Sequence, residues 1–188
     1  MSRLIERYLK KISEEFDGKP DFGFSSDSPH HPRNLALNRV KYGYVEGSYV
    51  VGAGQEDPNV REEEREYLSG LARKAEEDSS EENLVNYAER LAANGYYELA
   101  ENMLGYLLTQ NPSSLLICHF LSRLNLDRGH IQTRKKRAKK MFRIACVLAR
   151  NGLRFEHGEH KSGLLEDCID SLSRLEKFRF RNRLCNRL

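Results

Sequence analysis

The sequence predicts a mainly α-helical protein, built as a short array of antiparallel helices with an N-terminal helix, an irregular segment and a basic C-terminal tail. Three observations predict this class. Apolar residues recur at helical spacing near the N-terminus, Asp57-Pro58 has the chemistry of a helix start, and a helical pattern repeats between residues 81 and about 152. At 188 residues the chain suits one domain with appendages.

The first predicted element is an amphipathic helix over residues 1–16. Its apolar positions lie three or four residues apart, and charged residues occupy the other faces. The apolar set is Leu4, Ile5, Tyr8, Leu9, Ile12 and Phe16. Because such stripes usually face a protein's own core, we expect this helix to dock internally rather than in a partner's groove.

Residues 17–55 form a loop-rich arm in this interpretation. From Asp17 to Asn34 the chain is dense in Gly, Pro, Ser and Asp, which favours an irregular conformation. Residues 37–52 then carry β-branched and aromatic residues on both sides of Glu46-Gly47. This pattern indicates a small hairpin between Val40–Val45 and Ser48–Val51.

A helical domain is expected over residues 56–177. Asp57 can cap the free amides of a helix, and the fixed φ of Pro58 suits the first helical position, so a helix should run to about Glu77. Ser79 and Glu82 have the spacing of a capping box for the next helix.

The strongest internal pattern lies in residues 84–112, where small and large residues alternate at fixed intervals. The large set is Leu84, Leu91, Leu104 and Leu107; the small set is Ala88, Gly95 and Ala100; Tyr87, Tyr97 and Pro112 complete the pattern. This segment resembles a tetratricopeptide repeat, clearest over residues 81–112. The resemblance implies two antiparallel helices that cross closely at the small residues, with Gly95 near the turn.

A second, irregular unit follows to about residue 152. Gly129 lies thirty-four residues after Gly95, which equals the period of the family, but the second helix fits only if about four residues are inserted around Gln132–Lys135. Asn151-Gly152 should end that helix. Helices near 58–77 and 162–177 would cap the array, since isolated repeats cannot bury both faces.

The resemblance implies a concave protein-binding face but no particular partner. The candidate groove residues are polar positions of the first repeat helix: Asn86, Glu89, Arg90 and Asn94. An unrelated helical bundle that matches the repeat by chance is the alternative.

Charge is strongly polarised along the chain although the net charge is only +3. Residues 56–82 hold eleven acidic and four basic residues, whereas residues 132–150 hold eight basic residues and no acid. The candidate phosphate-binding residues of this second region are Arg134, Lys135, Lys136, Arg137, Lys139 and Lys140. RNA phosphates favour such a surface because binding releases counterions. A solvated helix face, a nuclear import signal and docking to an acidic protein are the alternatives.

The C-terminal tail, residues 178–188, interleaves Phe and Leu with Arg179, Arg181, Arg183 and Arg187. The alternation favours an extended arm that stacks on bases and neutralises phosphates, with a helix end packed on the domain as the alternative. A compact helical body with basic arms is also the form of many proteins in ribonucleoproteins. An RNA-associated factor, bound to rRNA in the ribosome, is therefore the second functional hypothesis.

Signals of catalysis and of cofactor binding are missing from the sequence. There is no P-loop, no GxSxG elbow and no dinucleotide fingerprint, so we expect a protein that is not an enzyme and needs no cofactor or small-molecule substrate. His157 and His160 lack a completing ligand set, so no metal is expected. Four scattered cysteines without a CxxC pair favour reduced core thiols. Without a signal peptide or an apolar span, a cytoplasmic protein is expected, with the nucleus as the alternative.

These observations together predict a non-enzymatic adaptor that docks protein partners within a larger complex.

Overall fold

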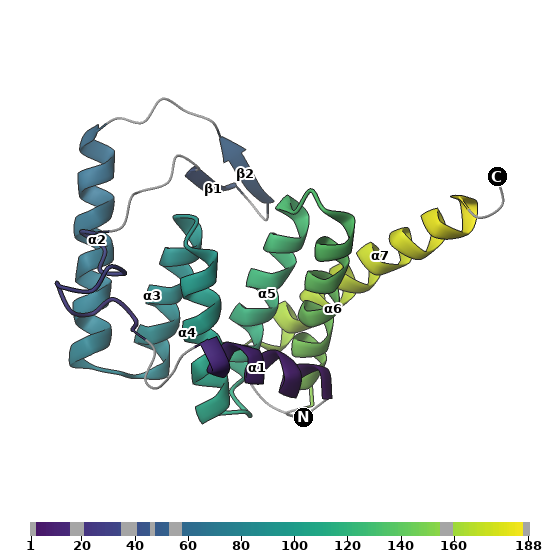
Figure 1. Cartoon of the computed structure of the whole chain (residues 1–188), viewed down its shortest axis with the longest axis horizontal. Coiled ribbons are helices and arrows are strands. Elements are labelled where there is room, and N and C mark those ends of the chain that lie inside the picture. Colours follow the sequence, from purple (N-terminus) through teal and green to yellow (C-terminus); the bar gives the residue numbers. More distant parts are fainter. Residues whose placement is uncertain are drawn as a thin grey trace. The chain divides into compact units, whose positions relative to one another are not determined.

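The computed structural model is mainly α-helical, as the sequence predicts (Figure 1). It describes residues 3–15, 21–34, 41–45, 48–52, 58–154 and 160–185; at residues 13, 15, 41–61 and 178–185 only the backbone is described. In chain order, the elements within these ranges are α1 (Arg3–Glu15), β1 (Lys41–Val45), β2 (Ser48–Gly52), α2 (Pro58–Glu77), α3 (Glu81–Ala93), α4 (Tyr97–Gln110), α5 (Leu115–Ile131), α6 (Lys135–Gly152) and α7 (Lys161–Cys185).

The predicted hairpin is present. Strand β1 pairs antiparallel with β2; Val45 lies opposite Ser48 next to the connection, and Tyr44 lies opposite Tyr49 one pair further along. Residues 21–34 are irregular, as their composition indicates. They are held by turns, including a hydrogen bond of 2.6 Å from the Ser28 hydroxyl to Asp21 Oδ2.

The chain divides into two compact units, so the predicted helical domain 56–177 is shared between them. One unit comprises residues 1–15 and 105–188, and the other comprises residues 16–104. The boundary falls within α4.

In the unit of residues 16–104, α2 and α3 pack together through small and aliphatic side chains. The buried set is Leu68, Ala72 and Ala75 from α2 with Leu84, Val85, Tyr87, Ala88 and Leu91 from α3. Phe24 of the irregular segment covers this core, with its ring centroid 5.9 Å from that of Tyr87. The apolar spacing of two helices thus produces one shared core.

Gly95 lies in the turn just after α3, as the repeat pattern predicts. The amide of Gly95 donates to the carbonyl of Ala92, and the amide of Tyr96 donates to that of Leu91, both at 2.9 Å. This is a Schellman arrangement, and Gly95 adopts the left-handed φ of 88° that it requires. The start of α3 differs from the prediction, because Ser80 rather than Ser79 is the cap, and its hydroxyl accepts from the amide of Asn83.

In the other unit, α5, α6 and α7 surround an apolar cluster of Leu126, Ala138, Phe142 and Ala145, against which Leu175 packs. Helix α1 docks in the same unit, as predicted. Its Ile5, Leu9 and Ile12 are buried, and the hydroxyl of Tyr8 accepts a hydrogen bond of 3.1 Å from Asn125.

The second repeat unit departs from the first at Gly129. This glycine was expected near a turn, but it is buried inside α5, which continues to Ile131. A side chain at Gly129 would meet the Phe142 ring, since an ideal Cβ would lie 2.7 Å from it. Helix α5 is four residues, about one turn, longer than α3, so the extra residues lie before the predicted insertion at Gln132–Lys135. Gly129 allows α6 to pack closely rather than ending a helix.

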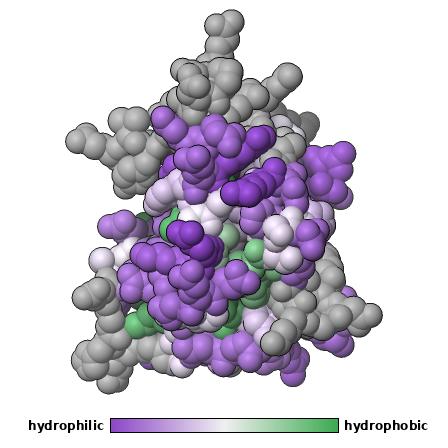
Figure 2. All heavy atoms as spheres, turned by 90° about the vertical axis from the view of Figure 1, so that its left-hand side faces the viewer, coloured by the Kyte–Doolittle hydropathy of each residue, from purple (hydrophilic) through white to green (hydrophobic). Residues whose placement is uncertain are grey.

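The surface on the left-hand side of Figure 1 is largely hydrophilic (Figure 2). No helix in the described ranges is long and apolar enough to cross a membrane. Among the described side chains, the thiols of Cys118, Cys146 and Cys168 are buried and form no disulfide, in agreement with the prediction of core thiols.

Candidate functional site

The basic cluster of residues 134–140 lies at the start of α6 and faces solvent. Ala138, on the opposite side, belongs to the apolar core, and Phe142 continues it one turn later. Arg134, Lys135, Lys136, Arg137 and Lys140 are exposed, and Lys139 is half-buried. Arg143, which was not among the predicted residues, is also exposed and lies on the next turn. Its signal was present, since it belongs to the same acid-free stretch.

Within the described part of the chain, no ion pair engages a side chain of this cluster. The position is also unfavourable for cations, because the N-terminal end of a helix carries positive partial charge. Arg134 is the N-cap residue of α6 and forms no side-chain cap bond. The cluster therefore carries a repulsion that the described residues do not relieve.

The C-terminal arginines lie beyond the described side chains. The backbone of α7 continues to Cys185, so the extended arm favoured for residues 178–188 is wrong over residues 178–185. The alternative was a helix end packed on the domain; the backbone is helical to Cys185, and the packing of these side chains stays a prediction. Arg179, Arg181, Arg183 and Arg187 therefore stay predictions.

The proposed groove residues of α3 differ in their surroundings. Asn86 and Glu89 are exposed. Arg90 binds the carboxylate of Glu64 in α2 through two nitrogens: Nε lies 2.6 Å from Oε1, and Nη2 contacts Oε2. Asn94 Nδ2 donates to the same Glu64 Oε1 at 2.7 Å. Two of the four residues therefore already bind α2.

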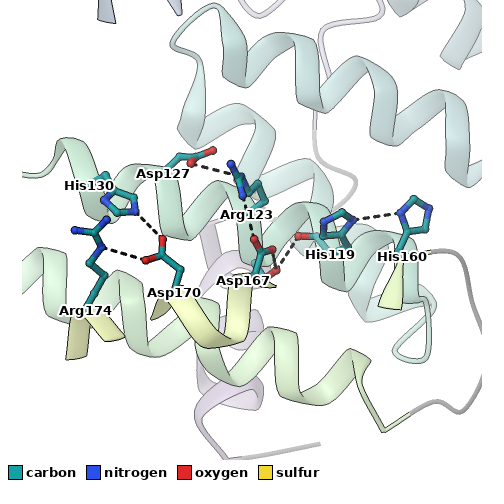
Figure 3. Close-up of polar contacts among 9 residues, drawn as sticks. His119, Arg123, Asp127, His130, His160, Asp167, Asp170 and Arg174 are labelled. Carbon is teal, nitrogen blue, oxygen red and sulfur yellow. Dashed lines mark hydrogen bonds and ion pairs between the residues drawn. The ribbon is translucent and has the colours of Figure 1, made fainter. Parts of the chain in front are cut away.

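A polar network joins α5 to α7 (Figure 3). Arg123 lies between two carboxylates, with Nε 3.7 Å from Asp127 Oδ1 and Nη1 3.4 Å from Asp167 Oδ1. The Ser122 hydroxyl donates to Asp167 Oδ2 at 2.6 Å. Burial raises the pKa of Asp127 to about 7, although Arg123 acts in the opposite direction. Burial also raises the pKa of Asp167, against the Ser122 hydrogen bond and Arg123.

A histidine pair, His119 and His160, lies beside this network (Figure 3). His119 Nδ1 and His160 Nδ1 are 3.2 Å apart, so one ring must donate and the other accept. Burial, followed by the charge of His160 and of Arg123, lowers the pKa of His119 to about 4. His157 lies outside the described residues. No group of three or more metal-ligating side chains occurs among the described residues.

No protein-family model matches this chain, and no curated protein and no solved structure was found to be significantly similar to it.

Proposed function

We propose that this chain is a non-enzymatic interaction protein that docks within a larger ribonucleoprotein assembly, and that the basic face of α6 contacts RNA phosphates. The observation that carries this proposal is the exposed cluster of residues 134–140, which has no acidic partner in the described part of the chain. Exposed cations without an acidic partner can replace the counterions condensed on a polyphosphate such as RNA.

The rest of the fold suits a scaffold. Packed helix pairs and the Schellman turn at Gly95 support a tetratricopeptide-like array, and the longer α5 distinguishes its second unit from a regular repeat. Binding of RNA by one face leaves other helices free to dock proteins, so the adaptor and RNA hypotheses combine in one molecule.

The experiment is a titration of fluorescent single-stranded RNA by anisotropy at several salt concentrations. The test variant replaces Arg134, Lys135, Lys136 and Arg137 with Ser. For single strands each neutralised phosphate contributes about 0.7 to the slope of log K against log salt. The variant should therefore bind more weakly and lower that slope by about 2–3.

The matched control removes the same charge from dispersed exposed positions: Arg3, Lys10, Arg73 and Lys74, each to Ser. If the control loses as much affinity and slope as the cluster variant, net charge rather than this face governs binding. If the wild-type chain binds no RNA at low salt, the proposal is wrong.

A second candidate, protein docking, is favoured by an apolar stripe on α7. Leu165, Ile169 and Leu172 are 52%, 59% and 45% exposed, and they follow the i, i+4, i+7 spacing of one helix face. The neighbouring face of α7, about 100° around the helix, packs on its own unit through Leu164 and Cys168. The stripe spans two turns, enough for a partner helix of similar length.

Charge around the stripe selects its occupant. The exposed acids Glu166 and Glu176 lie beside the apolar positions, so the partner that fits is an amphipathic helix with basic flanks.

The probe for this candidate is a synthetic helix of Leu and Lys, compared with the same helix carrying Glu in place of Lys. The Lys peptide should bind, and the triple change of Leu165, Ile169 and Leu172 to Ser should abolish that binding. Equal binding of both peptides contradicts the charge argument. If the chain self-associates and the triple variant abolishes that self-association, the stripe binds a second copy of the chain instead.

A further inference from the structure

A small pocket lies at the junction of α5, α6 and α7, next to the basic face. It has a volume of about 300 Å³. Its lining residues are Gly129, His130, Gln132, Lys135, Ala138, Phe142, Arg174 and Lys177. All of them belong to the unit of residues 1–15 and 105–188. Lys135 belongs both to the pocket and to the basic cluster, so the two features are continuous.

The floor of the pocket is apolar and its rim is cationic. Gly129, Ala138 and Phe142 are buried, and they form the floor. Lys135 and Lys177 are exposed at the rim, and no ion pair engages either side chain within the described residues. Among the described contacts, one acid, Asp170, lies beside the rim. Its Oδ1 is 3.2 Å from Arg174 Nε, and its Oδ2 is 3.2 Å from His130 Nε2. Rim charge is therefore positive.

Two side chains add groups suited to a flat heterocycle. The ring of His130 meets the Phe142 ring edge to face, at 5.3 Å between centroids and 75° between planes, so packing fixes its orientation. The Oε1 atom of Gln132 accepts from the amide of Arg134 at 3.2 Å, which leaves its NH₂ group as a donor. Imidazole rings stack on unpaired bases in RNA-binding proteins, and amide groups hydrogen-bond to base edges.

We propose that this pocket receives one unpaired nucleotide of an RNA strand, with the base over the apolar floor beside His130 and its phosphate near Lys135 and Lys177. The proposal rests on the proposed function, because the neighbouring phosphates follow the basic face of α6. A pocket of about 300 Å³ lies at the lower limit of the range for small-ligand sites, so it suits one nucleotide rather than a larger group. Base-paired RNA keeps its bases stacked inside the helix. The pocket therefore gives the chain a preference for single-stranded RNA.

The experiment compares three ligands of equal length: a single-stranded RNA, its duplex, and a strand with the same sugar-phosphate backbone but no bases. Anisotropy should give about tenfold tighter binding of the single strand than of the other two, the ratio that about 1.4 kcal/mol of base contact provides. The His130→Ala variant should lose this preference while keeping its salt dependence. Lys177→Glu should weaken the single strand more than Lys74→Glu, a control with the same charge change on an exposed position of α2.

The outcomes separate the two proposals. Equal binding of the three ligands by the wild-type chain overturns the pocket proposal and leaves phosphate binding by α6 intact. Binding of none of them overturns both. Because the comparison with the base-free strand needs no substitution, the test stands even if the His130 variant fails to fold.

Discussion

Arg123 pairs with a buried carboxylate of α7 and a partly buried one of α5, so its removal should destabilise the fold in a pH-dependent way. Asp167 is 1% exposed and Asp127 is 19% exposed, whereas Arg123 itself is 33% exposed. Loss of one partner of a buried ion pair costs about 3–5 kcal/mol. Because Arg123 is partly solvated, we expect about 2–3 kcal/mol for Arg123→Gln at pH 8. For a chain of this length that lowers Tm by about 4–12 °C.

The pH dependence distinguishes electrostatics from packing. A carboxyl whose folded pKa is raised gives the protein stability at low pH that is lost as pH rises through that pKa, here about 7 for Asp127. Without Arg123, which lowers the pKa of both carboxyls, their folded pKa values rise further. The loss caused by Arg123→Gln should therefore shrink to under about 1 kcal/mol at pH 5, where protonation removes the uncompensated charge.

Thermal unfolding followed by circular dichroism at pH 5 and pH 8 measures this difference. Arg143→Gln is the matched control, because Arg143 is exposed and should change stability by no more than about 0.5 kcal/mol. An equal loss at both pH values for Arg123→Gln would refute the electrostatic reasoning and assign the residue to packing alone.

Three further changes test the remaining contacts. Because the folded pKa of His119 is lowered to about 4, stability should fall as pH falls from about 6.5 toward 4, and urea denaturation of His119→Gln should remove that component. Glu64→Ala should cost about 1–2 kcal/mol in the same assay, since Arg90 and Asn94 lose a shared acceptor while Arg90 stays 42% exposed. Gly95→Ala should cost about 1–2 kcal/mol in thermal unfolding, because its φ of 88° disfavours a side chain; an unchanged Tm would contradict this.

Local chemistry predicted most of the secondary structure. The start of α2 at Pro58, the hairpin of residues 41–52 and the turn at Gly95 all depend on residues that are close in sequence. The buried stripe of α1 also followed from its spacing. In each case a short-range pattern determined the backbone conformation, so a single sequence was enough to predict it.

Long-range packing was not predictable in the same way. Gly129 has the spacing of a turn, but the Phe142 ring requires a residue without a Cβ at that point of α5. Arg90 and Asn94 have the pattern of open groove positions, but Glu64, twenty-six residues from Arg90 in sequence, binds them both. A period or a face indicates where a side chain points, and only the fold determines what it meets.

The candidate site also has one part that local sequence predicts and one part that depends on long-range packing. The cluster of residues 134–140 was visible as composition, whereas the pocket beside it needs His130 from α5 and Lys177 from α7. Two kinds of cation can also be distinguished among the described residues. Arg90, Arg123 and Arg174 each bind a carboxylate of another residue in their own unit, whereas those at the start of α6 have no ion pair among the described residues and sit where the helix dipole opposes them. Cations that stabilise the fold and cations that cost it stability thus occur in the same chain, and a bound polyphosphate would relieve the repulsion of the second kind.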